Sequence, residues 1–174
     1  MHELIINEEH YARVLDSIVP EAQRFLWIAT ADIKDVHVEG PGSKFIPFLS
    51  VLADLVTEGV DVRLIHAKEP GPAFREDFDL FPVLIESDRF ERILCPRMHM
   101  KVIIIDGRMA YIGSANLTGA GIGAKSPRRR NFEAGVLTDD PETIETLMDE
   151  LDHLYLGKHC PDCGRREHCP DPIA

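Results

Sequence analysis

One stretch of the chain, between residues 99 and 116, holds polar residues whose types suit an attack on a phosphate group. It reads His99-Met-Lys101, four residues, Asp106, six residues, then Gly113-Ser114-x-Asn116. A neutral imidazole can attack phosphorus, and an ammonium group can neutralise a non-bridging oxygen. Hydroxyl and amide groups can donate hydrogen bonds to the other oxygens. The set therefore indicates chemistry at a phosphodiester.

Two predicted strands would position this set. Residues 98–105 and 109–115 are strongly apolar, and Asp106-Gly107 between them is a strong turn signal. Side chains two residues apart share a face of a strand, so His99 and Lys101 point the same way. Ser114 and Asn116 likewise share a face. A two-residue turn would place His99 opposite Ser114 and a four-residue turn would place it opposite Asn116; either way all four lie on one face. Asp106 falls at the turn, where we expect it to support the site rather than contact substrate.

The spacing resembles the phospholipase D superfamily, whose motif HxK(x)4D(x)6GSxN is matched at every defined position. The resemblance continues in Asn116-Leu-Thr118 and Asn131-Phe-Glu133, which look like downstream elements of the small bacterial endonuclease branch. In that branch a glutamate orients the catalytic histidine, and Glu133 is the matching residue. By resemblance, the catalytic set is His99, Lys101, Asp106, Ser114, Asn116 and Glu133.

The resemblance implies a metal-independent reaction in two steps. One histidine attacks to form a phosphohistidine, a second protonates the leaving oxygen, and water then hydrolyses the intermediate. The second histidine comes from another copy of the motif, and this chain carries only one copy. A homodimer with one His99 from each subunit at a shared site is therefore expected.

Charge bears on which phosphodiester is cleaved. The chain has 30 acidic and 19 basic residues and a net charge of −11, whereas proteins that coat nucleic acid are usually basic. Tight binding over a long footprint is therefore not expected, but a local basic site is. The loop 119–131 supplies one, in Lys125, Arg128, Arg129 and Arg130.

A nuclease that hydrolyses DNA or RNA is the favoured function. The alternatives are a phospholipid hydrolase of the phospholipase D type and a nucleic-acid-binding module without turnover. The chain has no basic amphipathic helix, lipidation signal or run of about 18 apolar residues, and its start is too polar for a secretory signal. We therefore expect a cytoplasmic protein without stable membrane association.

Three of the four cysteines gather near the end of the chain and predict a metal site. Cys160-Pro-Asp-Cys163-Gly has the form of a zinc knuckle, and Cys169 supplies a third thiolate. The fourth ligand is sought among His153, His159 and His168; His153 is preferred because the other two are adjacent to cysteines. Structural zinc is favoured over an iron–sulfur cluster. Cys95 is interpreted as a buried strand residue.

The wider pattern predicts an α/β fold, with a mixed, mostly parallel β-sheet flanked by helices as in the phospholipase D-like α/β/α sandwich. We expect a catalytic domain over residues 1–156 and a cysteine-rich tail over 157–174. Asn7 is expected to cap the first helix, and residues 32–44 to form a loop. The predicted helices are 8–17, 44–58, 71–80 and 141–156, and the predicted strands are 24–29, 60–65, 90–94, 98–105, 109–115 and 132–137.

Overall fold

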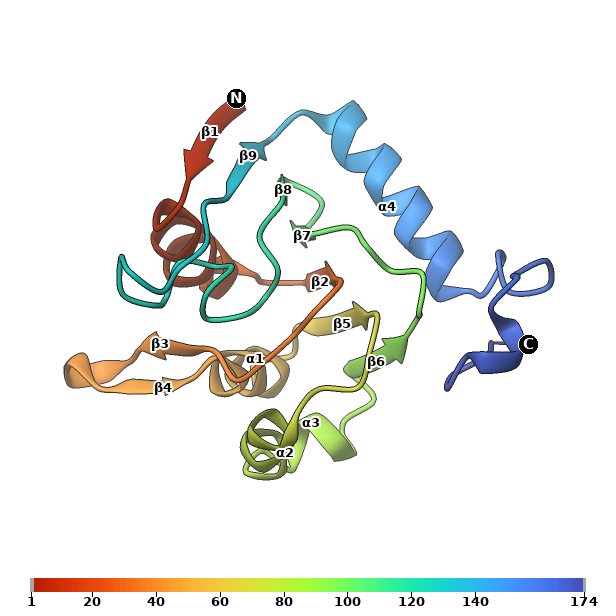
Figure 1. Ribbon diagram of the computed structural model, residues 1–174, viewed down its shortest axis with the longest axis horizontal. Helices are drawn as coiled ribbons and strands as arrows, with labels where there is room; N and C mark the ends of the chain where they lie inside the picture. Colours follow the sequence, from red (N-terminus) through yellow and green to blue (C-terminus); the bar gives the residue numbers. More distant parts are fainter. Residues whose placement is uncertain (1, 174) are drawn as a thin grey trace.

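A seven-stranded sheet forms the centre of the computed structural model, which describes residues 2–173 (Figure 1). Its strand order is β1-β9-β8-β7-β2-β5-β6. The bounds are β1 His2–Ile6, β2 Phe25–Thr30, β5 Asp61–His66, β6 Phe90–Leu94, β7 Val102–Ile105, β8 Met109–Gly113 and β9 Ala134–Thr138. A separate hairpin pairs β3 (His37–Glu39) with β4 (Phe45–Pro47).

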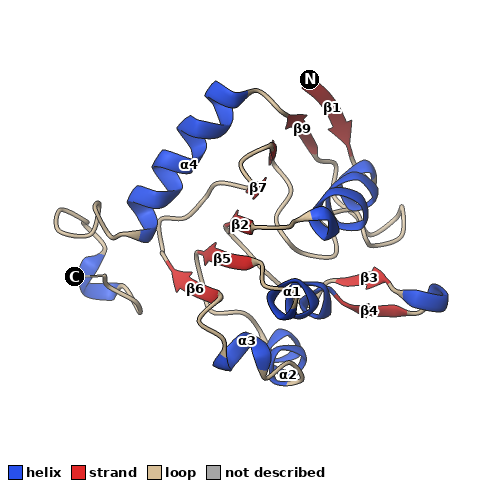
Figure 2. Cartoon of the chain, turned by 180° about the vertical axis from the view of Figure 1, so that it is seen from behind, coloured by secondary structure: helices blue, strands red, loops and turns tan. Residues whose placement is uncertain are grey.

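Helices cover both faces of the sheet, as the two opposite views show (Figures 1 and 2). On one face α4 packs Ile144 and Leu151 against Ile104 and its neighbours. On the other face a helix with π-type hydrogen bonds and α1 contribute Leu15 and Leu52 to the larger core. The helix bounds are His10–Ile18 for the π-helix, Phe48–Thr57 for α1, Pro72–Asp79 for α2, Val83–Glu86 for α3 and Pro141–Tyr155 for α4; the 3-10 turns are Val19–Glu21, Pro41–Ser43 and Arg166–His168. Within residues 2–173, no helix combines the length and the apolar character needed to cross a bilayer.

The α/β/α sandwich with a mixed sheet is confirmed, but the expectation of mostly parallel pairing is wrong. Only β2–β5 and β5–β6 are parallel in the main sheet. The other four pairings are antiparallel, because β7 and β8 form a hairpin and then β9 and β1 add beside it. The short connection between β7 and β8 can only join antiparallel neighbours.

Two further expectations about local structure are corrected. Residues 32–44, predicted as a loop, contain β3 and the turn that leads into β4. Asn7 does not cap the π-helix: it has a positive φ of 52°, and the cap position is occupied by Glu9 without a side-chain hydrogen bond. The side chain of Asn7 is used elsewhere, at the site described next.

Candidate active site

Three segments of the motif region meet at one end of the sheet. His99 and Lys101 lie in the extended segment that leads into β7, Ser114 follows β8, and Glu133 precedes β9. The backbone N–H of Gly113 donates to the carbonyl of Lys101 at 3.0 Å, and that of Ser114 donates to the carbonyl of Ala134 at 3.0 Å. These bonds fix the three segments side by side beyond the regular ladder.

His99 and Lys101 point the same way, as their spacing predicts. The Lys101 ammonium donates to the backbone carbonyl of His99 at 2.8 Å and lies 3.2 Å from its ring Nδ1. An ammonium group only donates, so in this contact Nδ1 is the acceptor. The His99 side chain is otherwise exposed, which leaves it free to meet a phosphate group from solvent.

Glu133 lies at the centre of a second polar group. Its carboxylate accepts hydrogen bonds from the Ser114 hydroxyl and, at 3.1 Å, from the Asn131 amide. Asn7 fixes the backbone here, because the Glu133 N–H donates to its side chain at 3.2 Å and the Asn7 N–H donates to the Glu133 carbonyl at 3.0 Å. Among the described residues no hydrogen bond joins Glu133 to His99, so the carboxylate holds Ser114 rather than the histidine.

Asn116 turns away from Ser114, toward the end of β2. Its side-chain oxygen accepts a hydrogen bond from the Asp32 N–H at 3.2 Å and lies 3.4 Å from the Thr30 hydroxyl, which donates to the Asp32 carbonyl at 2.9 Å. Thr30 also accepts from the Leu117 N–H at 3.1 Å and is buried. Thr30 and Asn7 are positioning residues that the spacing of the motif does not reveal. In the sequence, Thr30 stands out only as a polar residue at the end of an apolar run.

The β7–β8 turn differs from both turn lengths considered from the sequence. Asp106 and Gly107 have positive φ, and the Arg108 N–H donates to the Ile105 carbonyl at 3.0 Å. In the strand pairing, Ile105 lies opposite Met109 and not Arg108, so the connection has three residues, Asp106 to Arg108. Arg108 leaves the ladder because its guanidinium bonds to the Asp106 carboxylate at 3.4 Å and the Glu21 carbonyl at 3.1 Å. The prediction that strand parity alone places Ser114 and Asn116 on the face of His99 is therefore wrong; both lie beyond the end of β8.

Asp106 anchors this turn far from the other motif residues. Its carboxylate accepts hydrogen bonds from the N–H groups of Gln23, Arg24 and Phe25, at 3.1, 2.8 and 3.0 Å, where the chain enters β2. Burial raises the pKa of the Asp106 carboxyl, but these donors and Arg108 outweigh it and hold the pKa below its usual value. Because β7 separates Asp106 from His99, Asp106 is not brought to the site and supports the hairpin instead.

The basic loop folds back onto the Asn116 segment. The Asn131 N–H donates to the Ala120 carbonyl at 2.9 Å, and a Cβ on Gly121 would lie 2.6 Å from the Asn116 carbonyl. Lys125, Arg128 and Arg129 are exposed at its tip. Arg130 differs, because it pairs with Glu8 at 2.9 Å and is largely covered.

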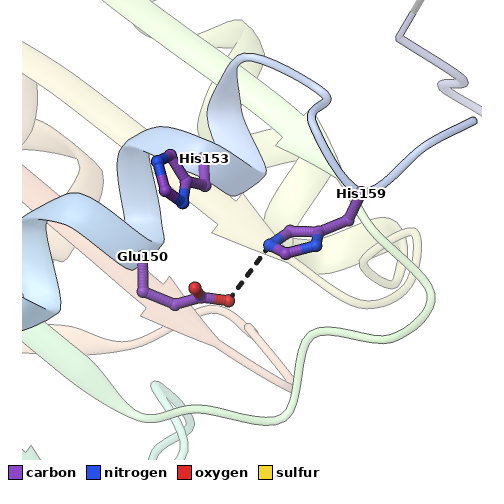
Figure 3. A group of neighbouring side chains, drawn as sticks. All are labelled: Glu150, His153 and His159. Atoms are coloured by element: carbon purple, nitrogen blue, oxygen red, sulfur yellow. Dashed lines mark ion pairs between the residues drawn. The ribbon is translucent and has the colours of Figure 1, made fainter.

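The predicted metal ligands do not form one group. His153 lies with Glu150 and His159, and one ligand atom from each falls within 4.8 Å of the others (Figure 3). Cys160, Cys163 and Cys169 instead line a cavity of about 510 Å³ beside His99, in a wall that does not include His153. Among residues 2–173, no group of three ligands within this distance includes a cysteine.

The sequence of this chain is similar to those of cardiolipin synthases and their domain family. Residues 15–155 match the family model described as cardiolipin synthase, PLD-like domain. The probable cardiolipin synthase YwiE of Bacillus subtilis is 31% identical over 137 residues, which are 75% of this chain and 24% of that protein. Cardiolipin synthase of Geobacillus thermodenitrificans is 29% identical over 110 residues, 58% of this chain and 19% of that protein. The chain thus spans about a quarter or less of the length of these relatives.

Solved structures share the fold at low identity. NucT from Helicobacter pylori superimposes with a TM-score of 0.62 at 18% identity, covering 86% of this chain and 92% of that one. Nuc from Salmonella typhimurium, a phospholipase D family member, gives 0.60 at 18% identity, covering 86% and 91%. In size this chain is therefore similar to the Nuc proteins.

Proposed function

Because this chain belongs to the phospholipase D superfamily, we propose that it is a phosphodiesterase whose nucleophile is His99. The observation that carries the proposal is the meeting of His99, Lys101, Ser114 and Glu133 at one end of the sheet, on three segments joined by backbone hydrogen bonds. Nothing in this set requires a metal ion, because the imidazole itself supplies the attacking lone pair.

Each of these side chains has a distinct task in the proposal. The Lys101 ammonium moves from His99 Nδ1 to a non-bridging oxygen, which frees the Nδ1 lone pair to attack phosphorus. The Ser114 hydroxyl exchanges its bond to Glu133 for one to a second phosphate oxygen, while it still accepts from the Ala134 N–H at 3.1 Å. Glu133, held by Asn7 and Asn131, positions Ser114. Asn116 is held by Asp32, and its amide N–H₂ remains available for the phosphate.

The general acid in this proposal is a His99 from a second copy of the chain. His66, at the same end of the sheet, is unsuitable: it is fully buried, and its ring nitrogens contact the Lys68 carbonyl and the Arg92 guanidinium, each at 2.8 Å. Burial also lowers the pKa of His66, which disfavours its protonated form. An exposed apolar surface near Glu133 supports docking of that copy. It comprises Leu4 and Ile6 on the edge strand β1 and Phe132, which is 95% exposed.

For the substrate we propose a nucleic-acid strand. Exposed Lys125, Arg128 and Arg129 stand on the loop that packs on the Asn116 segment, and they suit a phosphate backbone. The fold shared with Nuc and NucT agrees with this choice.

Phospholipid is a second candidate substrate, favoured by one specific observation. The cavity beside His99 is lined largely by apolar side chains, among them Ile65, Met98 and Leu154, which could receive an acyl chain. The family model and the relatives named as cardiolipin synthases point to the same chemistry.

Cleavage assays with both substrates test these proposals. Labelled single- and double-stranded oligonucleotides and phosphatidylglycerol or phosphatidylcholine vesicles are incubated with wild type and His99→Asn, with EDTA added at the time of assay. We expect oligonucleotide cleavage that His99→Asn lowers by about three orders of magnitude or more and that EDTA does not change. Turnover of lipid alone would contradict the nuclease proposal, and activity that survives His99→Asn would contradict the phosphodiesterase mechanism.

A further inference from the structure

The C-terminal tail is docked on the segment that leads to His99, beside the end of β6 (Figure 1). The Arg165 guanidinium donates to the Pro96 carbonyl at 3.0 Å, and the Leu94 N–H donates to the Asp171 carboxylate at 3.3 Å. The Cys169 thiol lies 4.0 Å from the Leu94 carbonyl. These contacts lie on both sides of Cys95, so the tail is hydrogen-bonded to both neighbours of the one cysteine that lies outside it.

All four cysteines of the chain face the same space. Cys95, Cys160, Cys163 and Cys169 line the cavity between the tail and the body, and each is a partly buried free thiol. Cys95 lies far from the other three cysteines in sequence, so its place in the same cavity wall results from the fold. The position of Cys95 beside the tail is the new observation, because it supplies a fourth thiol where His153 does not reach.

The chemistry of this set suits one kind of ion. Four thiolates arranged tetrahedrally form a closed structural zinc site, and soft sulfur ligands favour zinc over harder cations. The Cys160-Pro-Asp-Cys163-Gly turn is already formed, with the Cys163 N–H donating to the Cys160 carbonyl at 3.2 Å. The thiols are not paired as disulfides, so they are available as ligands.

We propose that Cys95, Cys160, Cys163 and Cys169 together bind one zinc ion that clamps the tail onto the segment carrying His99. In the structure no three of these sulfur atoms lie within 4.8 Å of one another, so binding draws the turn around Cys160 and Cys163 inward. The tail can make this movement because it contains only short turns and few buried side chains. The ion is structural, since four protein ligands leave no open position for water.

Glu150, His153 and His159 form the competing ligand set (Figure 3). The carboxylate and the two imidazoles are close enough for one ion, but His159 Nε2 already pairs with Glu150 Oε1 at 3.3 Å. Both of those side chains are about half exposed, as surface ion pairs commonly are. Oxygen and nitrogen ligands give a different spectrum from sulfur ligands, so an experiment can separate the two sets.

Metal analysis of the full chain, purified without chelator, tests the proposal. Zinc content is measured for wild type, Cys95→Ser, Cys163→Ser and the control His153→Ala, and each protein is then loaded with Co²⁺ in place of zinc. We expect one zinc per chain in wild type and in His153→Ala, with the intense sulfur-to-cobalt charge-transfer absorption. Both cysteine variants are expected to lose most of the zinc and to weaken that absorption.

The variant Cys95→His distinguishes the loss of a ligand from misfolding of the chain. It retains a ligand at this position, so it should keep the ion while its cobalt spectrum shifts toward mixed sulfur and nitrogen ligation. Undiminished zinc and an unchanged spectrum in Cys95→Ser would overturn the proposal, as would zinc lost in His153→Ala. Iron or no metal in wild type would also overturn it. His99→Asn should retain its zinc, so the outcome is independent of whether the proposed phosphodiesterase activity is found.

Discussion

At the scale of single residues, the motif divides into side chains to which the proposal assigns substrate contact and side chains that support the chain. Asp106 belongs to the second kind. Replacing it with Asn removes the charge that three backbone N–H groups and Arg108 stabilise, so we expect a loss of about 1.5–3 kcal/mol in the free energy of unfolding. Denaturant unfolding of Asp106→Asn, with Asp35→Asn as an exposed control, measures it; equal stability of the two variants would contradict the anchoring role.

The lowered pKa of the Asp106 carboxyl makes the free energy of unfolding depend on pH. Its pKa is lowered in the folded chain, so its stabilising contribution is present above the unfolded pKa of about 3.9 and is lost as pH falls through the lower folded value. The difference in unfolding free energy between wild type and Asp106→Asn should therefore be full at neutral pH and shrink below about pH 4. Unfolding curves at several pH values check this; a difference that grows on acidification would contradict it.

Glu133 is the residue whose carboxylate organises the other half of the site. In Glu133→Gln the Ser114 hydroxyl loses a charged acceptor, so we expect kcat for oligonucleotide cleavage to fall by about 10²-fold or more while KM changes little. Steady-state kinetics, beside Glu145→Gln on the exposed side of α4, measure the effect. A Glu133→Gln enzyme with wild-type kcat would exclude this positioning role.

At the scale of elements, two glycines allow β8 and β9 to approach each other over Tyr111. Gly113 and Gly135 are paired, and a Cβ on either would lie 2.2 Å or 2.5 Å from the buried Tyr111 ring or hydroxyl. We expect Gly113→Ala and Gly135→Ala each to cost about 1–3 kcal/mol of unfolding free energy, because the tyrosine must move within a packed core. Gly71→Ala, which has open space, is the matched control. Thermal unfolding indistinguishable among the three would contradict this packing argument.

The elements that the sequence predicts well are those whose pattern is local. The buried strand β2 is a nearly continuous apolar run, and β5 alternates apolar Val62 and Leu64 with charged Asp61 and Arg63. Helix α4 has helical spacing with Asp140 as its N-cap, whose carboxylate accepts from the Thr143 N–H at 2.9 Å. In contrast, β1 forms through pairing with β9 at the other end of the chain, with Leu4 and Ile6 exposed, so no local pattern indicates it.

The site shows the same division. Motif spacing predicts His99, Lys101, Ser114 and Glu133 as site residues, because their order along the chain resembles that of the family. It cannot identify Thr30 or Asn7, which act through contacts with residues 86 and 126 positions away. Nor can it give the three-residue turn at Asp106, which depends on Arg108 reaching Glu21 in a distant segment.

At the scale of the whole molecule, the proposed mechanism needs two motif histidines, and we propose that two chains supply them. Each chain supplies one His99; the other histidine beside the Glu133 group, His10, is fully buried and its Nδ1 contacts the Asn7 carbonyl at 2.9 Å. The zinc clamp and the dimer are separate proposals: the first fixes the segment before His99 within a chain, and the second brings two such segments together.

Mixing active and inactive chains tests this central claim most directly. Wild type at a fixed amount is co-refolded with increasing His99→Asn, and oligonucleotide cleavage is measured. Because a mixed dimer holds only one of the two histidines, we predict that an equal amount of His99→Asn lowers activity to about half and a ninefold excess to about a tenth. Activity that stays constant as His99→Asn is added, with mixed dimers present, would contradict a site shared between chains.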